Sequence, residues 1–283
     1  MTEPLGSAGR VASDLERSFV LALGGAALSI AGATLVAHER VPISRFNYVE
    51  VHGVSPERQT GFFERALDFY FQRALRPTFR LPIPEPAHLV RVLRGFAFEP
   101  AHEPVRVLAA ELAGQAPART AAEPPSTPDL AALADLWADE RERPELRAAL
   151  DVAVRFPNPA EELVPVVVRQ SGSAIAAAAV FRDRDVGAIF GVTTQAEHRG
   201  RGTATALVES IVRSSPVGPV RQLVMWADSE RLATRLGRLG FSEVARFRPF
   251  ELPLEASFPI PAPGPATPPR WRPPRPRSDR QPR

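Results

Sequence analysis

The fold is decided by residues 192–204, Val-Thr-Thr-Gln-Ala-Glu-His-Arg-Gly-Arg-Gly-Thr-Ala. A β-rich apolar run, Val186–Thr194, leads into this short basic loop, and a helical pattern, Thr205–Arg213, follows it. Such a loop can point several backbone N–H groups at one anion, and the helix dipole favours negative charge at the same place. The stretch therefore predicts a phosphate site between a strand and a helix.

The composition sets limits on the chemistry of the chain. With 283 residues, of which 44% are hydrophobic and 24% charged, it is typical of a soluble protein with one large or two medium domains. The chain has no cysteine, which excludes disulfides and thiolate metal sites. It also has no lysine, which excludes Schiff-base chemistry. We expect a site without a metal ion.

The charge is unevenly distributed along the chain. The net charge is +3, but residues 256–283 carry six arginines and one aspartate, so the remaining residues sum to −2. A near-neutral body lacks the basic field of a nucleic-acid binder. The sequence therefore argues against a nucleic-acid partner.

One apolar stretch, Phe19–Ala37, is long enough to span a membrane but is interrupted by glycines and small polar residues. Its turn chemistry instead predicts the end of a helix at Leu23 and a hairpin of strands Ala26–Ile30 and Ala33–His38. Acidic residues precede the stretch, unlike in a signal peptide. We expect a cytoplasmic protein that does not contact the membrane.

Two globular segments are expected, residues 13–112 and residues 128–254. Between them, residues 113–127 are rich in Ala, Pro and Gly and are typical of a linker. Residues 255–283 form a Pro/Arg-rich tail that cannot bury a core and is expected to be disordered.

The second segment has a clear order of expected elements. Thr127-Pro128-Asp129 is a helix start, with Thr127 as N-cap. Three strands are expected next, Leu163–Arg169, Ala174–Phe181 and Val186–Thr194, and the glycine loop and its helix follow them. The remaining expected elements are the strand Val220–Ala227, the helix Arg231–Leu239 and the strand Phe241–Phe247.

This order resembles the GCN5-related N-acetyltransferase (GNAT) superfamily over about residues 127–252. The family's loop signature, Gln/Arg-x-x-Gly-x-Gly/Ala, is matched by Arg199-Gly200-Arg201-Gly202-Thr203-Ala204. A second family landmark, a helix that ends in Leu-Gly-Phe, is matched by Leu239-Gly240-Phe241. The combination is more specific than either signature alone.

The resemblance implies an α/β (α+β) fold with a mixed, mostly antiparallel central sheet flanked by helices. It also implies acetyl-CoA, or another acyl-CoA, as a ligand and acyl donor. The backbone of the loop, Arg199, Gly200, Arg201, Gly202, Thr203 and Ala204, would hold the pyrophosphate. The strand end, Val192, Thr193 and Thr194, would pair with the pantetheine arm. The implied activity is direct transfer of an acetyl group to an amine, carried by a small molecule or a protein.

The chemical machinery matches the family less well. Many members use a tyrosine four residues before the Gly of Leu-Gly-Phe to protonate the leaving thiolate, and this position is Leu236. Ser229, where the family often starts that helix with Asn, is the nearest hydroxyl, with a plain helix N-cap as the alternative. Asp228 and Glu197 are candidate bases, with capping or solvated carboxylates as the alternative.

The first segment repeats the same order weakly. It has a hairpin, a strand Phe46–His52, a helix Glu57–Leu75, and then a strand and a helix closed by Gly95-Phe96, which lies 145 residues before Gly240-Phe241. The same shift places the glycine loop on Val54–Gln59, which has no glycine. Its proline removes a donor and its glutamate repels phosphate. We therefore expect tandem GNAT-like folds, of which only the second binds CoA.

Two other functions stay open. The missing tyrosine favours a non-catalytic acyl-CoA-binding or regulatory module. The Pro/Arg tail favours an interaction protein that binds polyproline-recognising domains or RNA. The sequence is also compatible with a homodimer.

Overall fold

A computed structural model of the chain describes residues 7–30, 32–41, 44–112, 127–137, 146–150, 161–214, 216 and 220–253. The linker expected at residues 113–127, apart from its last residue, and the tail expected at residues 255–283 lie outside these ranges.

The first segment contains three helices and six strands among its described residues. They are α1 (Ser7–Ala22), β1 (Ala26–Ile30), β2 (Ala33–Ala37), β3 (Tyr48–Val51), α2 (Gln59–Phe71), β4 (Thr78–Pro82), α3 (Ala87–Gly95), β5 (Glu99–Pro100) and β6 (Val105–Glu111). The predicted hairpin of residues 26–38 is confirmed. The sequence did not predict β5 or β6.

The second segment follows the predicted order of elements. They are α4 (Thr127–Trp137), β7 (Glu161–Gln170), β8 (Ser173–Asp183), β9 (Val186–Thr194), α6 (Thr203–Ser214), β10 (Gln222–Ala227), α7 (Glu230–Gly237) and β11 (Ser242–Glu251). A 3₁₀ turn, Ala196–His198, links β9 to the glycine loop, and residues 146–150 are helical.

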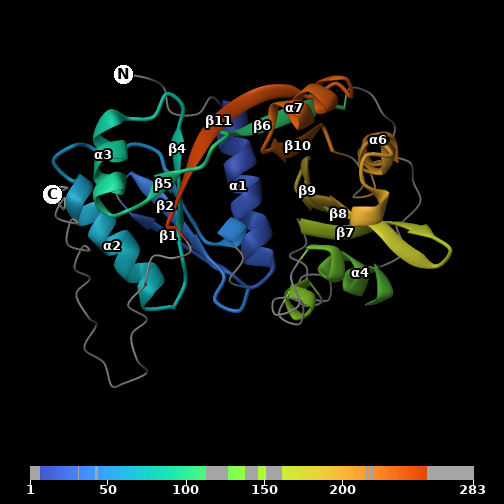
Figure 1. The fold of residues 1–283 in the computed structure, drawn as a ribbon, viewed down its shortest axis with the longest axis horizontal. Helices are drawn as coiled ribbons and strands as arrows, with labels where there is room; N and C mark the ends of the chain where they lie inside the picture. The colour runs from blue at the N-terminus through green and yellow to red at the C-terminus, as the bar shows by residue number, and fades with distance from the viewer. Residues whose placement is uncertain are drawn as a thin grey trace, which may run out of the picture.

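The described strands form a single sheet in the order β1-β2-β3-β4-β11-β6-β10-β9-β8-β7, with β5 paired to β11 (Figure 1). Only the pairs β3–β4 and β9–β10 are parallel within the described residues. The expected mixed, mostly antiparallel sheet flanked by helices is therefore confirmed.

The last strand of each segment lies among the strands of the other. β6 pairs with β10, with Leu108 opposite Met225, and β11 pairs with β4, with Phe250 opposite Phe79. β6 and β11 also pair with each other at the centre of the sheet. The strand order consequently reads alike from both ends, as two five-strand halves that exchange their last strands.

The faces of the second half are covered by different helices, and the period-two alternation of the strands sorts the side chains. Phe19 of α1 and Leu133 of α4 pack with Phe190 of β9 on one face. Leu207 of α6 and Leu236 of α7 pack with alternate residues of the same strands on the other face. We call these the α1 face and the α6 face.

The stretch Phe19–Ala37 folds as the end of α1 followed by the β1–β2 hairpin. Across the ranges that the structure describes, we find no helix with both the length and the apolarity that a membrane span requires.

Candidate active site

The central feature of the site is a split between β9 and β10. These parallel strands pair only at their starts, from Gln222 opposite Val186 to Val224 opposite Ala188. Beyond that point β10 continues beside β6, and β9 continues beside β8 to Thr194. The backbone edges of both strands therefore diverge and face an opening.

A bulge in β9 widens the opening. The register against β8 shifts between Phe190 and Thr193, and Gly191 has a φ of +57°, in the left-handed region. The indole Nε1 of Trp137 donates a hydrogen bond to the carbonyl of Gly191. A Cβ atom at Gly191 would overlap the indole ring. Only glycine allows both this backbone conformation and this close approach.

The glycine loop lies between β9 and α6, as predicted. Gly200 and Gly202 have φ values of +78° and +85° and therefore use the conformation that glycine tolerates best. The first intrahelical bond of α6 runs from the N–H of Ala206 to the carbonyl of Gly202, at 2.9 Å. The preceding N–H groups have no partner within the helix and form the positive end of its dipole.

Arg199 fixes the start of this loop. Its Nε donates to the carbonyl of Thr194 at 3.1 Å, which joins the loop to the end of β9. The side-chain oxygen of Thr194 is buried and lacks a hydrogen-bond partner among the described residues. The loop and the strand end thus form a continuous polar edge beside the split.

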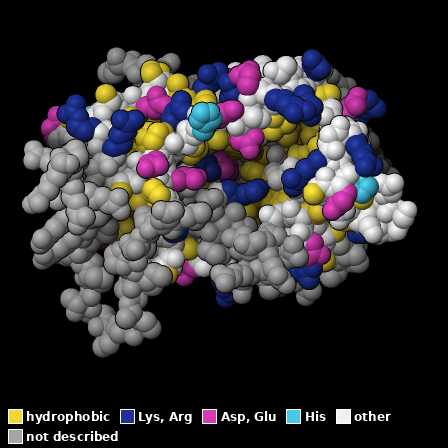
Figure 2. Space-filling model, in the orientation of Figure 1, with side chains coloured by type: hydrophobic (Ala, Val, Ile, Leu, Met, Phe, Trp, Pro, Cys, Tyr) yellow, Lys and Arg dark blue, Asp and Glu magenta, His cyan; other side chains and the backbone are white. Residues whose placement is uncertain are grey.

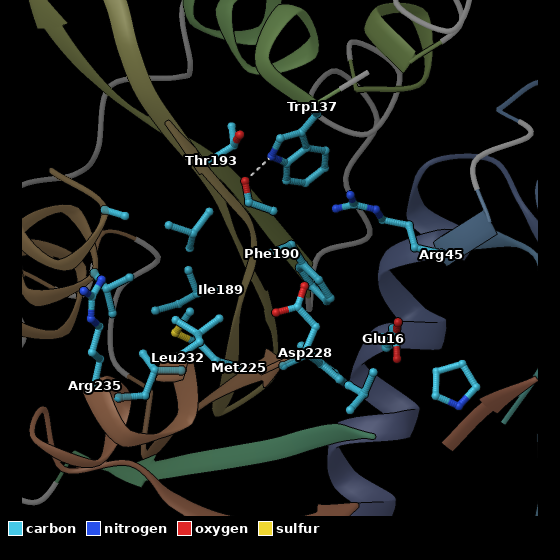
Figure 3. A pocket seen from close by; sticks show the side chains of 18 of the residues that line it. Glu16, Arg45, Trp137, Ile189, Phe190, Thr193, Met225, Asp228, Leu232 and Arg235 are labelled. Carbon is cyan, nitrogen blue, oxygen red and sulfur yellow. Dashed lines mark hydrogen bonds between the residues drawn. The ribbon is translucent and has the colours of Figure 1, made fainter. Parts of the chain in front are cut away.

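A cavity of about 570 Å³ occupies the split (Figure 3). Ile189 and Met225 line it from the α6 face, and Phe190 and Trp226 line it from the α1 face. Because adjacent residues of β9 and β10 alternate between the faces, the cavity passes through the sheet. We call its two parts the donor lobe, on the α6 face beside the glycine loop, and the acceptor lobe, on the α1 face.

The predicted residues fall at different places around this cavity. Val192, Thr193, Ala204 and Asp228 line it, together with Leu236. Gly200 and Gly202 lie in the exposed loop beside it. Ser229 and Glu197 are not among the described residues that line the cavity.

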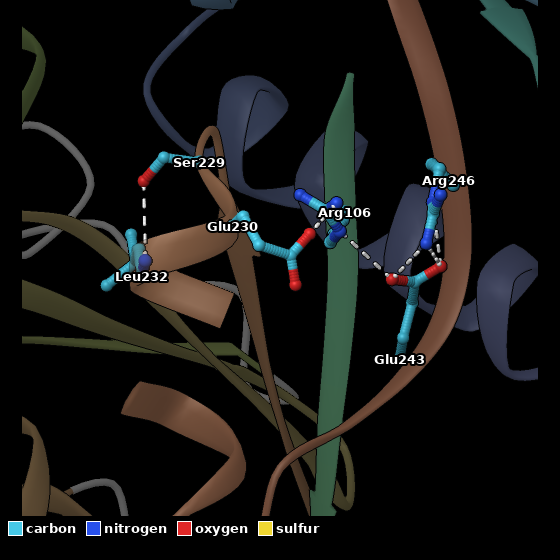
Figure 4. Close-up of polar contacts among 6 residues, drawn as sticks. All are labelled: Arg106, Ser229, Glu230, Leu232, Glu243 and Arg246. Atoms are coloured by element: carbon cyan, nitrogen blue, oxygen red, sulfur yellow. Dashed lines mark hydrogen bonds and ion pairs between the residues drawn. The ribbon is translucent and has the colours of Figure 1, made fainter. Parts of the chain in front are cut away.

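Ser229 caps α7. Its side-chain oxygen accepts a hydrogen bond from the backbone N–H of Leu232 at 3.3 Å. The next residue, Glu230, pairs with Arg106 of β6, which also contacts Glu243 of β11 at 3.2 Å (Figure 4). Arg106 therefore ties the start of α7, next to Asp228, to the two exchanged strands.

The far side of the acceptor lobe belongs to elements that sequence reasoning did not connect with the site. Both terminal guanidinium nitrogens of Arg80 on β4, Nη1 and Nη2, donate to the carboxylate of Glu16, on α1, at 2.6 and 2.9 Å. The Arg80 guanidinium also lies 3.6 Å from the ring centre of Tyr48 and 5.0 Å from that of Phe247. Burial is the largest influence and opposes the charge of Arg80, but Glu16 and the other acidic groups nearby together outweigh it and hold the pKa of Arg80 above its usual value.

Tyr48, one of the two tyrosines in the chain, lies beneath this ion pair. Its side chain is buried, and its hydroxyl has no hydrogen-bond partner among the described residues. Burial, followed by the Glu16 carboxylate, raises the pKa of Tyr48 well above its usual range. Tyr48 is therefore a neutral phenol at physiological pH.

The surface view shows where the cavity opens. An apolar hollow lies between α1 and the second half of the sheet, with arginines and acidic side chains around its rim (Figure 2). Within the described ranges, no group of three or more His, Asp or Glu side chains is arranged to hold a metal ion.

The comparisons with known proteins agree with this geometry. Residues 130–241 match the model of the acetyltransferase (GNAT) family. A search of curated proteins gives no match. The structure is similar to a GCN5-related N-acetyltransferase from Kribbella flavida (TM-score 0.59, 19% identity), with 88% of this chain and 96% of that chain covered.

Two further solved structures share the fold. A functionally unknown conserved protein from Staphylococcus epidermidis has a TM-score of 0.58 and 11% identity, over 81% of this chain and 94% of that chain. A GCN5-related N-acetyltransferase from Sphaerobacter thermophilus has a TM-score of 0.50 and 16% identity, over 77% of this chain and 76% of that chain. Residues 130–241 therefore resemble the GNAT family, whose members use acetyl-CoA as acyl donor, and the structure shares the fold of these solved proteins.

Proposed function

We propose that the protein is an acyl-CoA-dependent N-acyltransferase that transfers an acetyl group from acetyl-CoA directly to an amine. The observation that carries this proposal is the cavity that passes through the sheet between β9 and β10. It lets a thioester enter from the α6 face and an acceptor from the α1 face. The two reactants can then meet at the bulge of β9.

The residues present fit acetyl-CoA. The loop from Arg199 to Ala204 offers backbone N–H groups at a helix start, which suit a pyrophosphate. Among the described residues, no strand lies beside the edge of β9 from Val192 to Thr194 on the β10 side, so this backbone can pair with the pantetheine amides. The partnerless hydroxyl of Thr194 supports a polar ligand at this edge.

The chain contributes mainly position and electrostatics. Holding the amine and the thioester together supplies a large part of the rate. The amine nitrogen attacks the thioester carbon, the carbon–sulfur bond breaks, the nitrogen loses a proton and the thiolate gains one. Asp228 faces the acceptor lobe and is the candidate to receive the proton of the amine, directly or through water.

The thiolate requires another proton source. Leu236 stands where the family tyrosine is expected, is 2% exposed and has no proton to give. Ser229 accepts a hydrogen bond when it caps α7, so the cap does not use its own hydroxyl proton. However, Ser229 is not among the described residues that line the cavity. We propose that water protonates the thiolate. Leu236 also favours the second candidate, a non-catalytic acyl-CoA-binding or regulatory module.

We also propose that the first segment is a tandem copy that does not bind CoA. The palindromic strand order supports a duplication. β3 pairs with β4 up to Glu50 and ends at Val51, whereas β9 extends from its last pair at Ala188 to Thr194. The first half therefore has no long free edge for a pantetheine arm, in addition to lacking the glycine loop.

Two measurements test the proposal. Calorimetric titration gives the affinity for acetyl-CoA, and a thiol-release assay over a panel of amines measures turnover. The absence of cysteine in the chain removes the protein's own background from a thiol reagent. Tight binding with turnover of an amine supports the enzyme. Tight binding without turnover of any amine supports the regulatory module.

A further inference from the structure

The acceptor lobe has an aromatic wall built from four elements, α1, α4, β9 and β10. The ring centres of Phe19 and Phe190 lie 4.2 Å apart with an interplanar angle of 11°, and those of Phe190 and Trp226 lie 4.9 Å apart at 16°. Trp137 adds a fourth ring, edge-on to Phe19 at 6.3 Å. Phe190, Trp226 and Trp137 all belong to the cavity lining. An apolar body can bury its surface against this wall.

A carboxylate lies at the end of the wall. Asp228 follows β10 two residues after Trp226 and points into the cavity beside Phe190 (Figure 3). No hydrogen bond or ion pair of its carboxylate is found with a described residue. Glu16, the acid that faces the same lobe from α1, is already neutralised by the two hydrogen bonds from Arg80. Glu251, the third acid that lines the cavity, lies at the end of β11, where its backbone pairs with β5. Asp228 is therefore the acid beside the aromatic rings and is placed to attract a cation there.

The lobe is bounded on the side away from the sheet split. Thr78 and Arg80 of β4 and Phe247 and Pro249 of β11 line the cavity opposite β9. The strand exchange brings these residues there, because β11 pairs with β4. The whole cavity, about 570 Å³, must also hold the end of the pantetheine arm. The space left suits a compact acceptor and not an extended chain.

From these three observations we infer that the acceptor is a small primary amine with an aromatic or bulky apolar body, bound as its ammonium ion. This inference rests on the proposed function. The ammonium lies at Asp228, near the bulge of β9, and the apolar body lies along Phe190 and Trp226. Loss of one proton then makes the nitrogen nucleophilic, and the Asp228 carboxylate or water accepts that proton.

The first arm of the test compares acceptors on the full chain. Thiol release is measured with acetyl-CoA and either 2-phenylethylamine, ethanolamine, putrescine or a tetrapeptide with a free amino terminus. We expect kcat/KM for 2-phenylethylamine to exceed each of the others by roughly tenfold or more, because a phenyl group buries the equivalent of several methylenes.

The second arm uses variants of the lobe. Asp228→Asn should lower kcat/KM for 2-phenylethylamine by roughly 10- to 100-fold, the range lost with a hydrogen bond to a charged group. Trp226→Leu should reduce the preference for 2-phenylethylamine over ethanolamine, and Trp226→Phe should keep it. Asp185→Asn, in the exposed turn between β8 and β9, is the matched control. Acetyl-CoA affinity, measured by calorimetry, reports whether each variant is folded.

The possible results separate the two proposals. Preference for 2-phenylethylamine, reduced by Trp226→Leu, supports the inference. Turnover that is best with putrescine, ethanolamine or the peptide overturns the inference and leaves the proposed function standing. Acetyl-CoA binding without turnover of any amine overturns the enzymatic function and the inference with it.

Discussion

The indole Nε1 of Trp137 donates a hydrogen bond to the backbone carbonyl of Gly191, so a helix of the α1 face holds the bulge in the strand that borders the donor lobe. The adjacent residues reinforce this link, since the hydroxyl of Thr193 donates to the carbonyl of Leu136 at 3.4 Å. Two hydrogen bonds therefore join the end of α4 to the bulge of β9. In the proposed function, the bulge lies where the thioester and the amine would meet.

Replacing Trp137 by Phe keeps a ring in place and removes the donor. We expect a loss of about 1–3 kcal/mol in the free energy of unfolding, because the carbonyl of Gly191 is left without its partner. We also expect a lower kcat. Urea denaturation and thiol release measure the two effects. Trp271→Phe, outside the described residues, is the matched control, and equal behaviour of both variants would contradict the role of this bond.

The glycine loop is tested by Gly202→Glu. A carboxylate beside the pyrophosphate should weaken acetyl-CoA binding by about 100-fold or more, since like charges ~4 Å apart near a surface repel by several kcal/mol. Calorimetric titration measures the affinity.

Gly172→Glu, in the turn between β7 and β8, controls for backbone strain. Gly172 has a φ of +83°, close to the +85° of Gly202. A Cβ atom added at either position would have no neighbouring atom within 4 Å. The Gly172 variant should bind acetyl-CoA like the unmodified protein. Equal loss in both variants would mean that strain, and not the phosphate site, is responsible.

The strand exchange predicts that residues 128–254 do not fold alone. In that fragment β10 and β11 would both lose β6, their shared antiparallel partner. We expect no cooperative thermal transition and no acetyl-CoA binding by the fragment, measured by circular dichroism and calorimetry. Deletion of residues 259–283, by comparison, should leave acetyl-CoA binding unchanged. A fragment that binds like the full chain would refute the structural role of β6.

Buried Glu50 on β3 makes stability depend on pH. Burial is the main cause that raises the pKa of Glu50 above its ordinary 4.5, while a hydrogen bond from Ser13 lowers it. As pH rises through 4.5, the unfolded chain releases this proton first, so stability falls until the folded carboxyl also ionises. Glu50→Gln should therefore raise the urea midpoint at pH 7, with a smaller gain at pH 4.

Glu57 provides the opposite case in the same segment. It is exposed, and a hydrogen bond from Ser55 lowers the pKa of its carboxyl. Glu57→Gln should leave the midpoint at pH 7 unchanged or slightly lower it. A higher urea midpoint at pH 7 in both variants would mean that the effect comes from the change in net charge and not from the burial of Glu50.

The donor side of the site could be predicted because its signals are local. The strand Val186–Thr194 has the predicted bounds, and the glycine loop and the helix before Phe241 are continuous in sequence. Ser229 also behaves as the plain N-cap that was the alternative to a catalytic role. Local hydrogen-bonding preferences are sufficient to place such elements.

The acceptor side could not be predicted, because distant segments assemble it. Val105–Glu111 is a short run of apolar residues without periodicity, and its place in the sheet depends on strands of the other segment. Trp137 could be interpreted only as part of the apolar face of a helix. Nothing in the spacing of Glu16 and Arg80 indicates that they meet at the same cavity.

The exchanged strands also set the timing of folding during synthesis. β6 leaves the ribosome before either of its neighbours, β10 and β11, has been made, and β4 waits for β11. At about 5–20 residues per second, translation from the end of β6 to the end of β11 takes on the order of ten seconds. During that interval the nascent chain exposes unpaired strand edges, which are prone to aggregation. The first half is therefore completed only when the second is nearly finished, and neither matures ahead of the other.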